Sequence, residues 1–184
     1  MATESWWNLV YTSSYDSPLG LITLASDGHN LIGLWIENQL NYEKTIDVNP
    51  IVDDNLQIFI QTKAWLDRYF AGEPMVIDDL PLLMHGSVFR ERVWQILRKI
   101  PYGKLVTYGD IAKEMATSAG LEKMSAQSVG GAVGHNPISI IVPCHRVVGT
   151  DGKLTGYAGG LDLKIKLLEL EGFEIDKEKM KVIL

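Results

Sequence analysis

Hydrophobic and polar positions in the first forty residues follow a pattern that predicts β-strands. Three strand-like segments lie between Leu9 and Glu37, and the last of them covers 31–36. Turns are expected at 17–20, where the sequence is Ser-Pro-Leu-Gly, and at 27–28, where it is Asp-Gly. An Asp-Gly pair between β-rich segments favours a tight hairpin. The pattern therefore predicts a small antiparallel sheet.

One helix is expected after this sheet. Residues 38–55 are polar and contain Pro50, so we interpret them as a loop. Apolar side chains then recur near the helical period over 56–70, and Ala-Gly-Glu-Pro at 71–74 ends the pattern. We interpret residues 75–86 as a linker.

The second half of the chain is expected to be mainly helical. Ser87 is a suitable N-cap for a helix that ends near Ile100, and Thr107 can cap a second, shorter helix. A third helix over 125–134 is rich in small residues and has weak helix propensity because of its glycines. The last helix is expected over 162–171.

Two features of this half bear on function. The short helices that begin near Thr107 and Ser125 could form a helix-turn-helix, whose second helix enters a DNA groove, although a plain helical hairpin gives this pattern more often. Residues 138–142 are a nearly continuous β-branched run, which predicts a buried strand or extended core segment. That run leads directly into Pro-Cys-His-Arg at 143–146.

Composition and charge suggest a two-part organisation. The sequence is 46% hydrophobic and 22% charged, as expected of a globular protein. Residues 1–86 hold three Lys or Arg against twelve Asp or Glu, whereas residues 87–172 hold eleven against eight. This asymmetry suggests two domains with different partners, although solvation of surface helices explains it equally well. Because no apolar run could span a bilayer and no signal peptide is evident, we expect a cytoplasmic protein.

The sequence contains one cysteine, Cys144. A single cysteine excludes internal disulfides, and the four histidines lack metal-ligand spacing, so we expect neither a metal nor another cofactor. Nearby cations lower the pKa of a thiol, so the adjacent His145 and the following Arg146 suit a nucleophile. The adjacency alone nevertheless favours a buried structural cysteine, because free cysteine is among the most buried residue types.

A longer series of motifs changes that balance. Residues 136–149 begin with Asn-Pro and continue as Ile-Ser-Ile-Ile-Val-Pro-Cys-His-Arg-Val-Val-Gly, which resembles the active-site signature of the O6-alkylguanine-DNA alkyltransferases. Further matching segments occur in the family's order at 87–94, 100–103, 107–112, 129–132, 156–161 and 169–172. The resemblance covers nearly all of 87–172. The first half of the chain is only loosely similar to the family's variable N-terminal domain.

The resemblance implies an α+β fold. A small N-terminal antiparallel sheet with a helix would precede a mainly helical C-terminal domain, which would hold a winged-helix-like helix-turn-helix and a buried active-site cysteine. The expected parts are a ribonuclease-H-like α/β domain at 1–80, a catalytic and DNA-binding domain at 85–172, and a C-terminal tail at 173–184.

The resemblance also implies single-turnover DNA repair by direct reversal. Cys144 would take the alkyl group from O6-alkylguanine, and O4-alkylthymine is a further candidate substrate. His145 would accept the thiol proton through a water and Glu171 would orient His145, which follows the logic of other activated nucleophiles. Asn136 would brace the turn before the active site. Tyr108 would favour extrusion of the damaged base and donate a hydrogen bond to the leaving guanine.

Double-stranded DNA is the partner that the resemblance implies, bound by a monomer with the 125–134 helix in the minor groove. The expected DNA contacts are Arg90, Thr107, Gly109, Ala126, Gln127, Ser128, Arg146 and Thr150. The flipped base would occupy a pocket lined by Val147, Val148, Tyr157, Ala158 and Gly159. Glycine in that loop lets the backbone approach a flat base closely. Thr107 is equally well explained as a plain helix cap.

Two positions depart from the family pattern. Many members carry an arginine where this chain has Gln127, and glutamine lacks the positive charge and the guanidinium plane. We therefore expect weaker, less salt-dependent DNA binding but unchanged chemistry. The stretch of five or so residues between Ala116 and Met124 is longer than the usual turn of the family, and we attach no functional expectation to it.

Three other functions remain open at this stage. A cysteine hydrolase would use Cys144, His145 and Glu171 but would need an oxyanion hole and would turn over. Non-enzymatic binders of alkylated DNA resemble this family but replace the nucleophile with tryptophan, so the presence of Cys144 argues against that class. A helix-turn-helix regulator would bind O6-alkylguanine no better than undamaged duplex.

Overall fold

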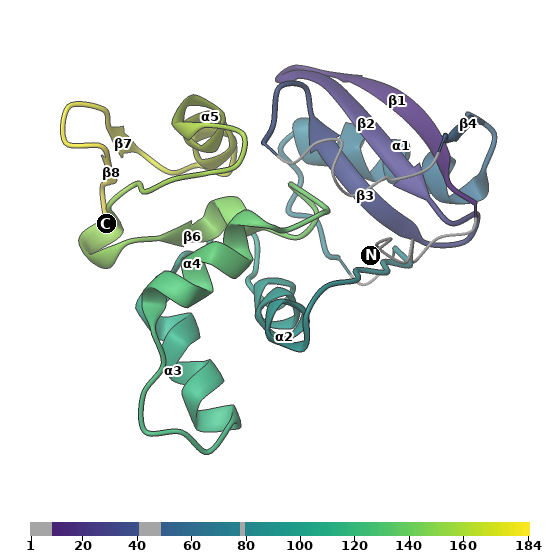
Figure 1. Ribbon diagram of the computed structural model, residues 1–184. Helices are drawn as coiled ribbons and strands as arrows, with labels where there is room; N and C mark the ends of the chain where they lie inside the picture. The colour runs from purple at the N-terminus through teal and green to yellow at the C-terminus, as the bar shows by residue number, and fades with distance from the viewer. Residues whose placement is uncertain (1–8, 41–48, 78–79) are drawn as a thin grey trace. The chain divides into compact units, whose positions relative to one another are not determined.

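The computed structural model describes residues 9–40, 49–77 and 80–184, which form two compact units (Figure 1). The N-terminal unit extends to His85 and also includes Pro137–Ser139. The C-terminal unit comprises Gly86–Asn136 and Ile140–Leu184. Within the described ranges, no helix is long and apolar enough to cross a membrane.

A four-stranded sheet of order β3-β2-β1-β4 forms the N-terminal unit. β1 (Tyr11–Ser17), β2 (Gly20–Ser26) and β3 (Leu31–Ile36) pair antiparallel in sequence order, which confirms the predicted strands and turns. Gly20 and Gly28 have φ angles of 115° and 103°, and glycine adopts such positive values without the steric cost that a Cβ imposes.

The fourth strand was not predicted. β4 (Ile51–Val52) pairs parallel with β1 at Tyr11 and Thr12, so the sheet is mixed rather than purely antiparallel. A two-residue strand has too few positions to show alternation, and its pairing depends on a partner about forty residues away. The predicted loop at 38–55 therefore contains an edge strand. Part of that loop, 41–48, lies outside the described residues.

α1 (Gln57–Phe70) packs on β1 and β2 and confirms the predicted helix (Figure 1). Its inner side buries Phe59, Leu66 and Tyr69, each exposed by less than 1%. The predicted linker after it is partly ordered against the sheet. Leu31 N donates to Pro81 O at 2.8 Å, and Leu83 N donates to Leu31 O at 2.9 Å.

Three helices that pack on one another begin the C-terminal unit: α2 (Val88–Leu97), α3 (Tyr108–Ser118) and α4 (Ala126–Gly134). Ser87, Thr107 and Ser125 each accept a hydrogen bond from a backbone N–H of the first turn, as their N-cap positions predict. Trp94 joins α2 to α4 by donating from Nε1 to Ala132 O at 2.9 Å. The predicted α+β class is confirmed.

A short parallel ladder links α3 to the segment that follows Cys144. β5 (Val106–Thr107) pairs with β6 (Val147–Val148), and neither strand was predicted. Because Thr107 also caps α3, the ladder joins the start of that helix to the chain three residues beyond the cysteine. Cys144 and the predicted helix-turn-helix are therefore parts of one packed unit.

The expected C-terminal tail is an integral part of the C-terminal unit. After α5 (Leu161–Leu170), β7 (Ile175–Asp176) and β8 (Lys181–Val182) form an antiparallel pair. The apolar side chains of this hairpin pack into a cluster with residues of β6, α5 and the segment between them: Val148, Leu154, Ile165, Leu168, Phe173, Ile175, Met180 and Val182.

Residues 138–142 are buried as predicted, but they do not form the predicted strand or extended segment. Ile138 forms one bridge with Leu34, and the remaining residues form a buried turn rather than a strand. Ile140 has a φ of 68°, a conformation that β-branched residues rarely adopt. A continuous apolar run indicates burial, but its periodicity does not distinguish a strand from a buried turn.

Candidate active site

Cys144 begins a 3-10 turn, Cys144–Arg146, between the buried turn and β6. All three residues of this turn are buried: Cys144 is 4% exposed, His145 0% and Arg146 3%. Buried polar and charged groups require hydrogen-bonding or ionic partners, because each otherwise loses its hydration without compensation. Those partners make up the site.

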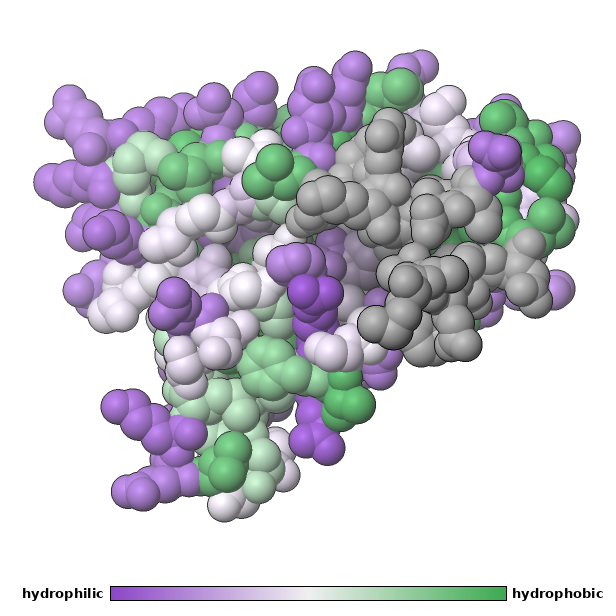
Figure 2. Space-filling view, viewed as in Figure 1, coloured by the Kyte–Doolittle hydropathy of each residue, from purple (hydrophilic) through white to green (hydrophobic). Residues whose placement is uncertain are grey.

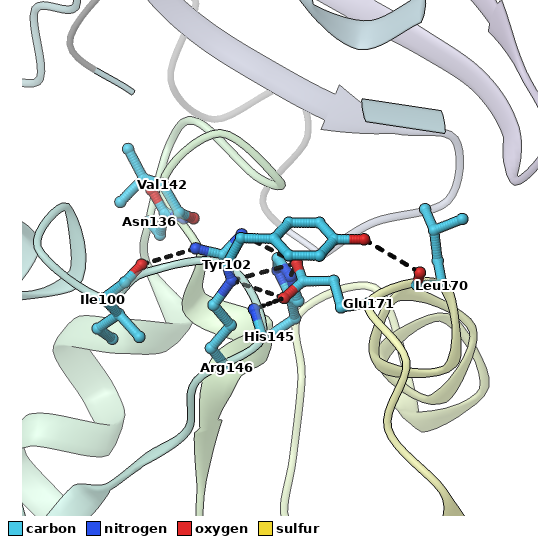
Figure 3. Close-up of polar contacts among 9 residues, drawn as sticks. Ile100, Tyr102, Asn136, Val142, His145, Arg146, Leu170 and Glu171 are labelled. Carbon is cyan, nitrogen blue, oxygen red and sulfur yellow. Dashed lines mark hydrogen bonds and ion pairs between the residues drawn. The ribbon is translucent and has the colours of Figure 1, made fainter. Parts of the chain in front are cut away.

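Asn136 connects the end of α4 to the cysteine. Its Nδ2 donates to Val142 O at 2.8 Å and to Cys144 Sγ at 3.1 Å. Asn136 and Val142 lie together at one side of the group in Figure 3. One amide therefore holds the turn closed and also supplies a donor to the sulfur. This is the geometry that the predicted bracing role of Asn136 requires.

Burial raises the pKa of the Cys144 thiol and outweighs four effects that lower it. In decreasing order these are the Asn136 hydrogen bond, the charge of Lys164, the contribution of Tyr157 and a backbone hydrogen bond at Cys144 itself. The expectation that His145 and Arg146 lower the pKa of this thiol toward neutral pH is therefore wrong. Desolvation disfavours the thiolate, and the cation that acts on the sulfur is Lys164 rather than Arg146, which is much closer in sequence.

His145 pairs with Glu171, the residue that ends α5. His145 Nε2 and Glu171 Oε1 are 2.7 Å apart, and both side chains are 0% exposed (Figure 3). The same carboxylate accepts from Arg146 Nε at 2.9 Å on Oε2 and from Arg146 Nη2 at 3.0 Å on Oε1. Gly103 N also donates to Oε2, at 3.2 Å. Both carboxylate oxygens are thus occupied by protein donors.

The charges around His145 determine whether its ring is protonated and which ring nitrogen carries the proton. Burial disfavours ionisation of Glu171, but the hydrogen bonds and charges of His145 and Arg146 outweigh it and hold the pKa of Glu171 at about 2. An ionised carboxylate only accepts hydrogen bonds, so Nε2 carries the ring proton of His145. Burial lowers the pKa of His145 and outweighs the opposing effect of Glu171. His145 is therefore neutral near pH 7, and Nδ1 is the nitrogen that can take a proton.

One predicted DNA contact, Arg146, instead lies buried in the active site. Besides its bonds to Glu171, it donates from Nη1 to Ile100 O at 2.6 Å, and its guanidinium lies 5.7 Å from the centre of the Tyr102 ring (Figure 3). Tyr102 in turn donates to Leu170 O at 3.2 Å. The structure contradicts a DNA-contact role for Arg146, because the side chain is 4% exposed and engaged inside the protein.

Comparison with known proteins accounts for both units. The model of the 6-O-methylguanine DNA methyltransferase DNA-binding domain matches residues 88–173, and the model of the ribonuclease-like domain of the same proteins matches residues 10–84. The chain belongs to the 6-O-methylguanine DNA methyltransferase family. The resemblance inferred from the sequence motifs is thereby confirmed.

Individual members of the family match over most of their length. A methylated-DNA–protein-cysteine methyltransferase of Methanosarcina acetivorans is 43% identical over 163 residues, which cover 89% of this chain and 99% of the relative. One from Mycolicibacterium paratuberculosis is 45% identical over 85% of this chain and 88% of the relative. The crystal structure of Mycobacterium tuberculosis OGT in complex with DNA has a TM-score of 0.76 and 42% identity, covering 88% of this chain and 92% of that one.

The other residues predicted for the site differ in burial, and two of them, Tyr108 and Tyr157, interact with Cys144. Tyr108 is the first residue of α3 and is half-buried; burial, reinforced by the charge of Cys144, raises its pKa. Tyr157 lowers the pKa of the Cys144 thiol. Val147 and Val148 are buried in β6. Ala158 and Gly159 are partly exposed in the loop before α5.

The predicted DNA contacts on α4 are exposed. Ala126, Gln127 and Ser128 form its first turn. A groove of about 800 Å³ lies beside them, lined by Gly109, Ala112, Lys113, Ala116, Thr117, Ala126, Gln127 and all residues from 121 to 125. The surface over α3 and α4 is mostly pale in Figure 2, with a few strongly hydrophilic side chains. The long turn after α3 therefore forms one wall of an open groove.

The remaining residues predicted to contact DNA differ in how exposed they are. Thr150 and Gly109 are exposed, and Arg90 is partly exposed in the first turn of α2. Thr107 and Asp110 form a full capping box, in which the Thr107 hydroxyl accepts from Asp110 N at 3.0 Å. The cap interpretation of Thr107 is confirmed, and its contact with DNA stays a prediction.

The sequence analysis missed one buried charged residue, Lys164. Its side chain is 0% exposed, and Nζ donates to Val147 O at 2.6 Å and to Thr155 O at 3.3 Å. A signal was present in the sequence, because Lys164 lies three residues after Leu161 and four before Leu168, on the apolar side of α5. A lysine on the buried side of an amphipathic helix is a candidate functional residue.

Proposed function

We propose that this protein repairs DNA by direct reversal, moving the alkyl group from O6 of a damaged guanine onto Cys144. The observation that carries the proposal is a buried thiol held by Asn136, next to a neutral histidine whose Nε2 is engaged by an ionised Glu171. Membership of the methyltransferase family supports it. So do relatives named for the transfer of methyl groups from DNA to a protein cysteine, and the DNA complex of M. tuberculosis OGT.

The reaction is a displacement at the alkyl carbon. The thiol proton passes to His145 Nδ1 through a water, and the electron pair on Sγ forms the new S–C bond. The C–O6 bond breaks, and its electron pair leaves with guanine, which receives a proton as it departs. Tyr108 donates the hydrogen bond that stabilises the leaving base. The product is a stable thioether, so each molecule acts once.

The damaged base must leave the DNA stack before it can react. Its O6 substituent is inaccessible inside a duplex, and Cys144 is itself only 4% exposed. Flipping a nucleotide costs a few kcal/mol, least when the base is damaged. We propose that α4 enters the minor groove through its small exposed residues, and that the loop at 157–159 with β6 receives the flipped base. The DNA would be bound by a protein monomer.

The proposal predicts a stoichiometric methyl transfer. After incubation with excess O6-methylguanine duplex, intact-mass measurement is expected to show one added methyl group per protein and then no further reaction. Because the chain contains one cysteine, Cys144→Ser is expected to acquire none. A duplex with unmodified guanine is the control substrate. Repeated turnover, or equal transfer to Cys144→Ser, would rule out the proposed function.

The proposed placement of α4 in the minor groove leads to a second prediction. Gln127→Arg adds a cation at an exposed position of the first turn of α4, so we expect tighter binding to duplex DNA. We also expect the slope of log affinity against log salt concentration to become steeper by about one unit, because roughly one more counterion is released from the DNA. Fluorescence anisotropy at several salt concentrations measures both quantities.

A matched control places the same charge elsewhere. Gln95 is exposed on α2 and is outside the groove lining, so Gln95→Arg is expected to change the salt slope less. If both variants changed the slope equally, or if Gln127→Arg left it unchanged, the proposed placement of α4 in the DNA groove would be wrong. The rate of methyl transfer at saturating DNA is expected to stay the same in both variants.

A further inference from the structure

Lys164 is a buried cation whose close polar contacts are all neutral. Its Nζ donates to the backbone oxygens of Val147 and Thr155 and lies 6.0 Å from the centre of the Tyr108 ring, within the range of a cation–π contact. None of the ion pairs within 4 Å among the described residues involves it. A fully buried ammonium without an anion is costly, because carbonyl dipoles replace only part of its hydration.

Glu171, the acidic side chain of the site, does not supply that anion. Glu171 is already held by two donors of Arg146, by His145 Nε2 and by Gly103 N. Val147, which accepts from Lys164, lies three residues beyond Cys144, across the 3-10 turn. Lys164 is thus hydrogen-bonded to the segment that contains Cys144.

The charges of Lys164 and Cys144 act on each other. Burial lowers the pKa of Lys164 to about 8, and the charge of Cys144 opposes this. Reciprocally, the charge of Lys164 lowers the pKa of Cys144 against the effect of burial. Arg146, although two residues from Cys144 in sequence, has its charge compensated by Glu171. The mutual effects of Lys164 and Cys144 on their pKa values therefore agree with the hydrogen bonds that hold Lys164 beside the Cys144 segment.

We infer that Lys164 is the buried counter-ion of the Cys144 thiolate, formed when the thiol gives up its proton for attack. The inference rests on the proposed role of Cys144 as the nucleophile. The ammonium would stabilise the ionised sulfur by charge, while Asn136 donates a hydrogen bond to it. Alkyl transfer converts the sulfur to a neutral thioether, so the spent protein keeps a buried lysine that has lost its counter-charge.

Direct alkylation of the thiol tests the inference without DNA. Because the chain has one cysteine, the rate of carbamidomethylation by iodoacetamide reports Cys144 alone. In Lys164→Met, the midpoint of the pH–rate profile is expected to rise by about one pH unit or more, the size typical of losing a nearby opposite charge. At pH 7 this is a loss of about tenfold in rate. His145, Tyr108 and Tyr157, the other titratable groups around the sulfur, are unchanged in this variant.

Two further variants separate charge from packing. Lys166 is exposed on the same helix, so Lys166→Met is the matched control and is expected to keep the wild-type midpoint. Lys164→Arg retains the cation, and we expect its midpoint to lie closer to wild type than that of Lys164→Met. Circular dichroism establishes that each variant is folded. A folded Lys164→Met with an unshifted midpoint, or equal shifts in Lys164→Met and Lys164→Arg, would overturn the inference.

A measurement on the wild-type protein does not depend on variants that fold. Nuclear magnetic resonance of protein labelled at lysine can follow the titration of Lys164 before and after alkylation with iodoacetamide. Alkylation removes the charge that opposes burial, so the Lys164 midpoint is expected to fall below about 8. An unchanged midpoint would overturn the inference. Failure of the proposed repair function has a different signature, since it would abolish transfer from methylated DNA and leave these DNA-free results intact.

Discussion

Glu171→Gln is expected to slow methyl transfer from O6-methylguanine DNA by about 100- to 10,000-fold, the range lost when general acid–base catalysis is removed. In the wild type, the ionised carboxylate accepts the Nε2 proton of His145 and leaves Nδ1 to act as the base. A glutamine amide can instead donate to Nε2. The ring would then carry its proton on Nδ1, which is the wrong tautomer for accepting another. Single-turnover kinetics with saturating DNA measure the effect.

The control for this prediction is on the same helix. Glu169 is exposed and pairs with the exposed Lys177, so Glu169→Gln is expected to leave the transfer rate unchanged. DNA affinity is expected to be similar in both variants, since neither residue was predicted to contact DNA. If Glu171→Gln transferred the methyl group at close to the wild-type rate, the assignment of His145 as the base oriented by Glu171 would have to be abandoned.

Arg146→Met is expected to lower the free energy of unfolding by about 3–5 kcal/mol, the usual cost of removing one partner from a buried ion pair. The substitution would leave Glu171 in the interior with His145 and Gly103 as its remaining donors, and Ile100 O without the Arg146 donor. Chemical denaturation at pH 7 measures this change. Such a loss is large relative to the total stability of a typical domain.

The matched control for Arg146→Met is Arg92→Met on α2. Arg92 is exposed, and we expect a change of less than about 0.5 kcal/mol there. A second signature is the acid limb of the stability curve. The pKa of Glu171 is lowered to about 2, so its contribution is complete above its ordinary value near 4.5 and is lost as the pH falls toward 2. Arg146→Met is expected to flatten this loss, and equal stability of the two variants would contradict the buried-pair argument.

Local signals in the sequence determined the helices and the first three strands of the fold, and many of their ends. The hairpin turns at 17–20 and 27–28 and the caps at Ser87, Thr107 and Ser125 all form where short-range hydrogen bonding predicts them. These features depend on residues within about four positions of each other, so the chain itself contains what is needed to predict them. The motif around Cys144 likewise marked the reactive residue, although the function came from family resemblance rather than from composition.

Tertiary structure alone decided which charges surround the sulfur. Arg146, two residues after Cys144, pairs with Glu171, while Lys164, twenty residues along the chain, supplies the cation that acts on Cys144. The turn at 138–142 and the ladders of β4, β5 and β6 were also hidden from pattern analysis. Sequence patterns report neighbours along the chain, whereas desolvation and Coulomb interactions depend on distances through space that exist only after the segments pack.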